Sequence, residues 1–147
     1  MVFGPDTWGD QHVATVADES GVDASRIRHL DDLDDTDLAV VISRALAFVA
    51  PSHDEAAGTA LIEAFSLGTP VIHSDVAAHL EISAGAGMAV PVGMADKGYA
   101  DRLAAAITSV VSDRALADRL SIAGSDRSRA FSWRDAGERV WQLHADL

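Results

Sequence analysis

The sequence predicts an α/β fold in which a parallel sheet carries helices on both faces. Short apolar runs alternate with helical patterns along most of the chain, and this alternation is typical of layered α/β domains. Residues 48–74 hold a strand, a helix and a second strand in quick succession. Such a unit is a right-handed βαβ crossover, which makes its strands parallel. At 147 residues, one domain is expected.

The first third of the chain is expected to supply two strands and two helices. Gly21 is expected to end the first helix, and Asp34, Asp35 or Thr36 to cap the second. The expected elements are a strand at residues 1–4, a helix at 7–19, a strand at 27–30 and a helix leading to residue 45.

The βαβ unit forms the centre of the prediction. Its first strand, 46–50, ends at a polar turn that contains Asp54 and Glu55. Gly58 opens a helix to about residue 67, and a second strand begins at Pro70 and ends at the turn with Asp75. Ligands of parallel sheets bind at the carboxyl ends of the strands. Both acidic turns fall at such ends, and the following stretch to Glu81 is expected to be a loop.

The last third is expected to be mostly helical. A turn at residues 85–87 leads into a strand at 88–92 and a helix at 96–111. Asp113 caps the next helix, and Ser132 caps the last one after a hinge at 131–133. Trp133 and Trp141 are expected to be core or docking residues.

The composition limits the partners and the compartment. The formal net charge of -12 argues against nucleic acid and against anionic membrane surfaces as main partners. There is no cysteine, which excludes disulfides and thiol nucleophiles. The amino terminus lacks a signal-peptide pattern and no apolar run is long enough to span a bilayer. We expect a cytoplasmic protein, with the inner membrane face as the peripheral alternative for the full enzyme.

The central stretch resembles a known enzyme family. Glu55 and Glu63 stand with seven residues between them, Gly58 among these. The flanking pieces that match are Pro51-Ser52, Glu63-Ala64, Gly68-Thr69-Pro70-Val71, Ser74-Asp75 and Glu81. In this order the string resembles the C-terminal, donor-binding domain of the retaining glycosyltransferases of family 4, which have the GT-B fold. The resemblance extends more faintly over residues 2–133.

The resemblance implies a Rossmann-like, partial GT-B domain and a reaction. A nucleoside-diphosphate sugar would be the donor substrate, and its sugar would pass to an acceptor hydroxyl with retention of the anomeric configuration. The acceptor would be a glycan, a lipid or a small molecule. The family works without a cofactor or a bound metal, so neither is expected here.

The resemblance also implies roles for single residues. Glu55 matches the glutamate that faces the transferred sugar, and we assign it the catalytic role. Glu63 matches the glutamate that holds the ribose hydroxyls. The proposed donor-binding set is Ala57, Gly58, Thr59, Ala60 and Glu63. In this set the backbone at Gly58, Thr59 and Ala60 would cradle the diphosphate, because helix N-termini bind anions.

Simpler structural interpretations stand beside these roles. Gly58 and Thr59 could merely start and cap a helix. Ser52 and Glu55 also fit a capping box, with serine three residues before glutamate. Glu63 could be an exposed helix residue. Finally, His73, Asp75 and His79 could be drawn as metal ligands, although three ligands on one turn are often coincidence.

The chain departs from the family pattern in two ways. Ala56 and Ala57 stand where the family usually has glycine and phenylalanine. The first strand-helix unit of the domain, its basic pair for the diphosphate and the whole acceptor domain have no counterpart in residues 1–147. We therefore expect a fragment that is inactive alone and has an exposed strand edge, which pairs with the missing domain or with a second copy.

Two other functions stay open on the sequence alone. The first alternative is a non-catalytic, truncated or decayed GT-B module that acts in assembly. A nucleotide-sugar epimerase of the same fold is a more distant one.

Overall fold

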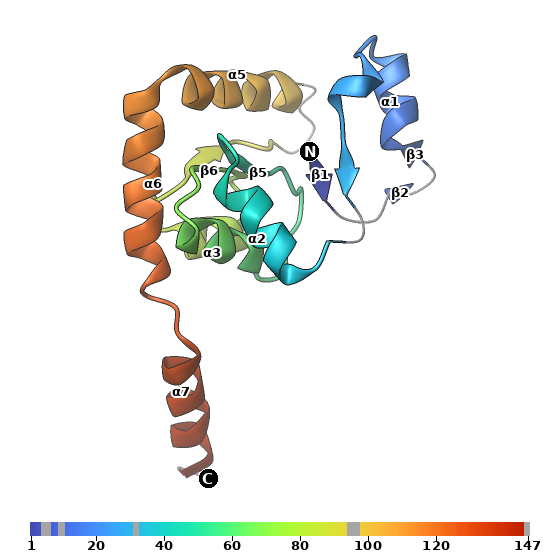
Figure 1. Cartoon of the computed structure of the whole chain (residues 1–147). Coiled ribbons are helices and arrows are strands. Elements are labelled where there is room, and N and C mark those ends of the chain that lie inside the picture. Colours follow the sequence, from blue (N-terminus) through green and yellow to red (C-terminus); the bar gives the residue numbers. More distant parts are fainter. Residues whose placement is uncertain (4–6, 9–10, 31–32, 94–97, 146–147) are drawn as a thin grey trace. The chain divides into compact units, whose positions relative to one another are not determined.

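A computed structural model describes residues 1–3, 7–8, 11–30, 33–93 and 98–145 (Figure 1). The chain divides into two compact units, Met1–Leu38 and Ala39–Leu147. We describe each unit by itself. None of the described helices is long and apolar enough to cross a membrane.

The first unit contains short strands and one helix. Its elements are β1 (Val2–Phe3), β2 (Thr7–Trp8), β3 (Gln11–His12), α1 (Val13–Glu19), the 3₁₀ turn η1 (Ala24–Arg26) and β4 (His29–Leu30). Strand β1 pairs with β4 in parallel, whereas β2 and β3 are antiparallel. Gly21 ends the helix as predicted: its φ is 68°, and the Val22 N–H donates to the carbonyl oxygen of Ala17 at 2.9 Å.

The predicted helix at residues 7–19 is wrong in its first half. Residues 7–8 and 11–12 form a β-pair, and the helix begins only at Val13. Thr7 and Trp8 are residue types that favour strands. From Val13 onward the predicted helix is confirmed.

Helix α2 (Asp35–Ser43) crosses the boundary between the units. Of the three candidate caps, Asp34 is the one used: its Oδ1 accepts the N–H of Asp37 at 2.8 Å. The second unit continues with β5 (Phe48–Ala50), α3 (Thr59–Ser66), β6 (Val71–Ser74), α4 (Ala77–Ser83), β7 (Met88–Val90), α5 (Tyr99–Ser112), α6 (Arg114–Ser128) and α7 (Trp133–Ala145).

The second unit is built on a parallel sheet in the order β5-β6-β7. Val49 pairs with Ile72, and Ile72 pairs with Met88 on the other side. The predicted parallel βαβ unit is therefore confirmed. Within this unit, β5 and β7 each pair with β6 alone and are the two edge strands. The exposed edge expected from the sequence stays a prediction.

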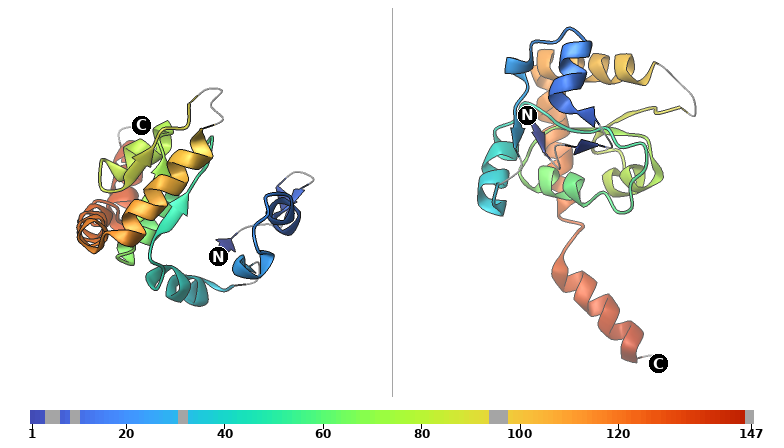
Figure 2. Two further views of the ribbon diagram at one scale, coloured as in Figure 1. Left: turned by 90° about the horizontal axis from the view of Figure 1, so that it is seen from above. Right: turned by 90° about the vertical axis from the view of Figure 1, so that its right-hand side faces the viewer.

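Helices cover both faces of this sheet, as predicted. Helix α5 packs against β7 and α3 packs against β5 and β6, above and below the sheet in Figure 1. The core under α5 consists of Ile72, Val90, Tyr99 and Val110. In Figure 2, α5 runs alongside the sheet when the chain is seen from above. Asp96, the predicted start of α5, lies outside the described residues.

Helix α6 packs tightly on α3 through a glycine. A Cβ atom at Gly124 would run into the ring of Phe65, which is completely buried. Glycine inside a helix is unfavourable by about 1 kcal/mol relative to alanine. Here it lets the two helices approach closely enough to enclose the Phe65 ring.

Helix α4 replaces the loop expected after Asp75. Its buried side chains are polar, His79 and Ser83, whereas Leu80 is exposed. The two buried residues are four positions apart, which is the spacing of one helix face, but they are polar and so give no apolar pattern. For this reason hydrophobic periodicity could not reveal the helix.

Helix α7 begins where predicted and is solvent-exposed along its length. Ser132 caps it by accepting the N–H of Asp135 at 3.0 Å. Trp133 is 94% exposed and Trp141 is 76% exposed. The alternative that these residues lie in the core is therefore wrong for this unit, and their docking role stays a prediction.

Candidate functional site

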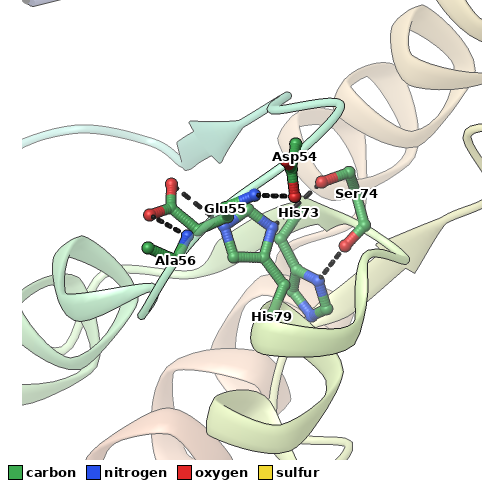
Figure 3. Close-up of polar contacts among 6 residues, drawn as sticks. All are labelled: Asp54, Glu55, Ala56, His73, Ser74 and His79. Atoms are coloured by element: carbon green, nitrogen blue, oxygen red, sulfur yellow. Dashed lines mark hydrogen bonds and ion pairs between the residues drawn. The ribbon is translucent and has the colours of Figure 1, made fainter.

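The site is built at the carboxyl end of β5, in the loop that leads to α3. This loop bends the chain so that the Glu55 side chain meets the backbone just before the helix. The N–H of Ala56 donates to Glu55 Oε1 at 3.1 Å (Figure 3). The N–H of Glu55 itself donates to Asp54 Oδ1 at 3.0 Å. The carboxylate of Glu55 thus lies against backbone donors rather than pointing freely into solvent.

These donors keep Glu55 ionised. Partial burial raises the pKa of its carboxyl, but the N–H groups of Ala57, Gly58 and Ala56, together with the nearby His79 ring, outweigh burial. The net pKa lies below the ordinary glutamate value. A carboxylate that accepts several N–H bonds behaves in this way. At neutral pH the loop therefore presents a fixed negative charge.

The capping box proposed for Ser52 and Glu55 is wrong. Helix α3 begins at Thr59, and its N-cap residue is Gly58, so neither residue stands at a capping position. No side chain accepts a hydrogen bond at this cap. Thr59 therefore does not cap the helix through its hydroxyl either. The first amides of α3, including those of Thr59 and Ala60, lie at an exposed helix start.

Gly58 has a conformation and a position that require glycine. Its φ is 64° and its ψ is 28°, in the left-handed region. A Cβ there would lie 3.2 Å from Cδ2 of His79 and 3.5 Å from Cγ1 of Ile82. A larger residue would therefore meet both backbone strain and a buried ring.

Glu63 lies exposed on α3, away from the Glu55 loop. It lines a pocket of about 830 Å³ between α3, the end of α6 and the start of α7. The lining residues are Thr59, Ile62, Glu63, Arg127, Ala130, Phe131, Ser132, Trp133, Asp135, Ala136 and Arg139. Of the predicted site residues, Thr59 and Glu63 share this pocket. Glu55 lies instead in the loop before the helix, where the N–H groups of Ala57 and Gly58 lower the pKa of its carboxyl.

A buried polar cluster beneath Glu55 escaped the sequence analysis as a unit. Nδ1 of His79 lies 3.0 Å from Ser74 Oγ, and its Nε2 lies 3.9 Å from Glu55 Oε2. Nδ1 of His73 lies 2.8 Å from the carbonyl oxygen of Ser74, so it carries the proton and donates. Figure 3 shows these residues gathered at the ends of two strands. The available signal was the pair His73-Ser74 in an otherwise apolar buried strand.

His73 is held neutral. Burial lowers the pKa of its ring below the ordinary histidine value; the hydrogen bond to the Ser74 carbonyl and the nearby Asp75 oppose this shift, while the neighbouring His79 adds to it. Nε2 of His73 is buried without a hydrogen-bond partner among the described residues. The rings of His73 and His79 meet edge to face, with centroids 5.7 Å apart.

The other acidic residues and the remaining histidine of the region have structural contacts. Oδ1 of Asp75 accepts the N–H of Val92 at 2.8 Å. The Glu81 side chain is exposed on α4. His53 is exposed, and its ring lies edge-on to Tyr99 at 5.3 Å between centroids. No group of three acidic, histidine or cysteine side chains in the described part of the chain is placed to hold a metal ion.

Comparison with known proteins gives a consistent family. Residues 24–127 match the model of the family described as glycosyl transferases group 1. Glycogen synthase from Mycobacterium tuberculosis is 34% identical over 122 residues, which are 80% of this chain and 28% of that protein. O-antigen chain mannosyltransferase B from Escherichia coli is 31% identical over 117 residues, 80% of this chain and 29% of that protein.

A solved structure agrees with the fold. Sucrose-phosphate synthase from Thermosynechococcus elongatus superposes with a TM-score of 0.77 at 32% identity, over 90% of this chain and 32% of that one. The agreement confirms the predicted α/β fold of GT-B type. The chain spans less than a third of the length of the curated relatives described above.

Proposed function

We propose, because this chain belongs to the glycosyl transferases group 1 family, that it forms the donor-binding domain of a retaining glycosyltransferase. The longer enzyme would move a sugar from a nucleoside diphosphate to an acceptor hydroxyl and keep the anomeric configuration. One observation carries the proposal: an ionised glutamate is fastened directly beside a helix N-terminus that no side chain caps.

The diphosphate is placed at the start of α3. Backbone amides of a helix N-terminus and its dipole favour an anion. The left-handed Gly58 has no side chain to block the approach, and Thr59 and Ala60 follow it on the exposed first turn. Under the structural alternative, a plain helix start, these exposed amides would bond to water.

The nucleoside is placed in the pocket beside Glu63. A carboxylate accepts two neighbouring hydroxyl protons, which suits the vicinal diol of a ribose. Thr59 lines the same pocket, so it would lie between the phosphate and the ribose. The volume of about 830 Å³ is in the range of small-molecule sites. Trp133 on the pocket wall offers an aromatic face for a base.

The transferred sugar is placed next to Glu55. Cleavage of a glycosidic bond develops positive charge at the sugar, and a fixed carboxylate stabilises such charge. The hydrogen bonds that keep Glu55 ionised also keep it in place. Together the three placements arrange a donor along α3, from Glu63 through the helix start to Glu55.

The acceptor would be held by another domain of the longer protein. Exposed side chains on α7, with Trp133 and Trp141 the largest, are the surface we propose for contact with it. The edge of β5 is proposed to pair with another domain of the longer enzyme or with a second copy. We expect the isolated chain to transfer no sugar, so transfer by the purified chain would contradict this part.

The alternative function is a non-catalytic module that serves in assembly. It is favoured by Ala56 and Ala57, which depart from the family pattern, and by the net charge of -12, which opposes a diphosphate. Arg127 in the Glu63 pocket is already engaged with backbone carbonyls, which reduces its value as a phosphate ligand.

Ligand-induced stabilisation separates the two functions. The chain is melted alone and with UDP-glucose, ADP-glucose or GDP-mannose. A site filled at about 100 times Kd adds roughly 2.7 kcal/mol, so one of the donors should raise Tm by several degrees. The shift should be lost in Glu63→Ala and Glu55→Gln and kept in Glu138→Ala, a matched exposed glutamate on α7. No shift with any donor supports the assembly module.

A further inference from the structure

His79 is a buried ionisable side chain that lies close to the carboxylate of Glu55. It lies in the first turn of α4, and only 1% of its side chain is exposed. Its ring contacts three segments: the end of β6 through Ser74, the loop before α3 through Glu55, and the backbone at Gly58. A side chain in this place cannot touch a large ligand from the surface, but it can set the position of groups that do.

We propose that His79 is a positioning residue for Glu55, its ring fixed by Ser74 on one side and facing the carboxylate with Nε2 on the other. This inference rests on the proposed function, in which Glu55 faces the transferred sugar, and identifies the residue that positions Glu55. The titratable groups that face the ring are Glu55 from the loop and His73 from β6.

One tautomer of a neutral His79 ring suits both of its polar neighbours, Ser74 and Glu55. The Ser74 hydroxyl can donate to Nδ1 of His79, 3.0 Å away. With Nδ1 as acceptor, the neutral ring carries its proton on Nε2, the atom 3.9 Å from Glu55 Oε2. That distance is too long for a hydrogen bond, so the contact is electrostatic. The opposite tautomer would set a nitrogen lone pair against a carboxylate, which is repulsive.

The ring also supports the backbone that holds Glu55. Its Cδ2 lies against Gly58, at 3.2 Å from the place that a Cβ would take. The N–H of Gly58 is one of the donors that lower the pKa of Glu55. One buried ring therefore faces the carboxylate and packs beneath one of its donors.

His73 provides the matched control. It is as buried as His79 and lies in the same cluster, yet its Nδ1 donates to the adjacent Ser74 carbonyl. Replacing His73 removes a buried imidazole without removing a contact to Glu55. Replacements of His79 can also be chosen by shape: asparagine keeps a polar atom near Nδ1, whereas glutamine keeps a donor near Nε2.

The first measurement is the pKa of Glu55 in the chain without any donor. Carboxyl ¹³C shifts are followed against pH, and Glu55→Gln assigns the signal. The pKa of Glu55 should rise in His79→Asn, be largely restored in His79→Gln, and stay at the wild-type value in His73→Asn. An equal pKa in the wild type and His79→Asn would overturn the proposal.

The second measurement needs no replacement of His79. Ring ¹⁵N shifts of the wild-type chain should report the tautomer with the proton on Nε2, and Glu55→Gln should change the Nε2 shift more than the Nδ1 shift. The inference would be overturned if the proton lies on Nδ1, or if Glu55→Gln leaves the ring ¹⁵N shifts unchanged. Both outcomes can be read even if the His79 variants fail to fold.

Both measurements are made without donor, so they stand apart from the proposed function. If donor binding also occurs, His79→Asn should raise the Kd of a sugar nucleotide by about tenfold. The Kd of the matching nucleoside diphosphate should rise by less than about twofold, because only the sugar meets Glu55. Equal losses for both ligands would contradict the positioning role. No binding of either, with the expected pKa and tautomer, would defeat the proposed function alone.

Discussion

Arg127 on α6 holds the C-terminal end of α4 through the carbonyl oxygen of Ile82, to which its Nε donates at 2.7 Å. Its Nη2 also donates to the carbonyl oxygen of Glu81 at 3.0 Å, and the guanidinium lies 4.7 Å above the Phe131 ring. A cation at a helix C-terminus satisfies unpaired carbonyls and interacts favourably with the helix dipole. Arg127 therefore holds the C-terminal end of α4, the helix that carries His79.

We expect Arg127→Ala to lower the free energy of unfolding by about 1.5–3 kcal/mol, the usual worth of hydrogen bonds to a charged group. Arg127→Lys should recover only part of it, because lysine lacks the fork geometry. The control is Arg129→Ala, which removes an exposed pair with Asp126 and should change stability by less than about 0.5 kcal/mol. Urea unfolding followed by circular dichroism measures all three; equal effects of the two alanine variants would disprove the capping role.

Gly58→Ala tests the loop before α3. We expect a loss of about 1–2 kcal/mol from the left-handed backbone, increased by the contact with the His79 ring. Gly21→Ala separates the two terms, since Gly21 has a φ of 68° and nothing within 4 Å of the added Cβ. Thermal melts should show the larger loss for Gly58→Ala. Identical losses would mean that the His79 ring moves aside freely.

Gly124→Ala sets helix propensity against packing. Alanine favours a helix by about 1 kcal/mol over glycine, yet its Cβ would run into the Phe65 ring. We expect a net destabilisation, because overpacking a tight contact costs about 1–3 kcal/mol. Gly137→Ala on α7 meets nothing within 4 Å and should stabilise its helix instead. Chemical denaturation of both variants tests the contrast, and a stabilising Gly124→Ala would show that α6 can withdraw from α3.

The pKa of His73 predicts how stability depends on pH. Its folded value is lowered, mainly by burial, so the unfolded chain takes up this proton first as the pH falls. The stability contributed by the neutral ring is complete above the unfolded histidine pKa of about 6.5 and is lost as the pH falls through the folded value. Unfolding free energies measured from pH 7.5 to 5 should therefore fall more steeply for the wild type than for His73→Gln.

His144→Gln, which alters an exposed histidine on α7, should keep the wild-type slope. A wild-type slope in His73→Gln would mean that another group controls the acid response. Glu55 acts in the same direction at lower pH, since its folded pKa is also below the ordinary value.

The sequence was most informative where local signals and tertiary contacts agree. Apolar residues at 48–50 and 71–72, separated by a helix that Gly58 opens, predicted the parallel β5-α3-β6 unit correctly. It failed at residues 7–8 and 11–12, which form a β-pair where a helix was expected, and at α4, whose buried face is polar. Periodicity reports which residues are apolar, and in α4 the inward residues are not.

The candidate site was predictable only in part, for a similar reason. Motif spacing placed Glu55 and Gly58 together in one loop, and the N–H of Gly58 contributes to the lowered pKa of Glu55. The link from Ser74 through His79 to Glu55 spans three elements, so no spacing along the chain encodes it. The pocket beside Glu63 depends on how α6 and α7 approach α3, which the pattern of any one helix does not determine.

The hydrogen bond between the Ala56 N–H and the Glu55 carboxylate orders the loop before α3, and this order has a thermodynamic consequence for ligand binding. A loop that is already ordered in the free chain loses little conformational freedom when a ligand arrives, and preorganised sites gain affinity mainly by avoiding that loss. Variants that loosen the loop without obstructing the ligand should thus weaken binding through a less favourable entropy while the binding enthalpy changes little. Calorimetric titration against temperature would display this as a change in the entropy of binding.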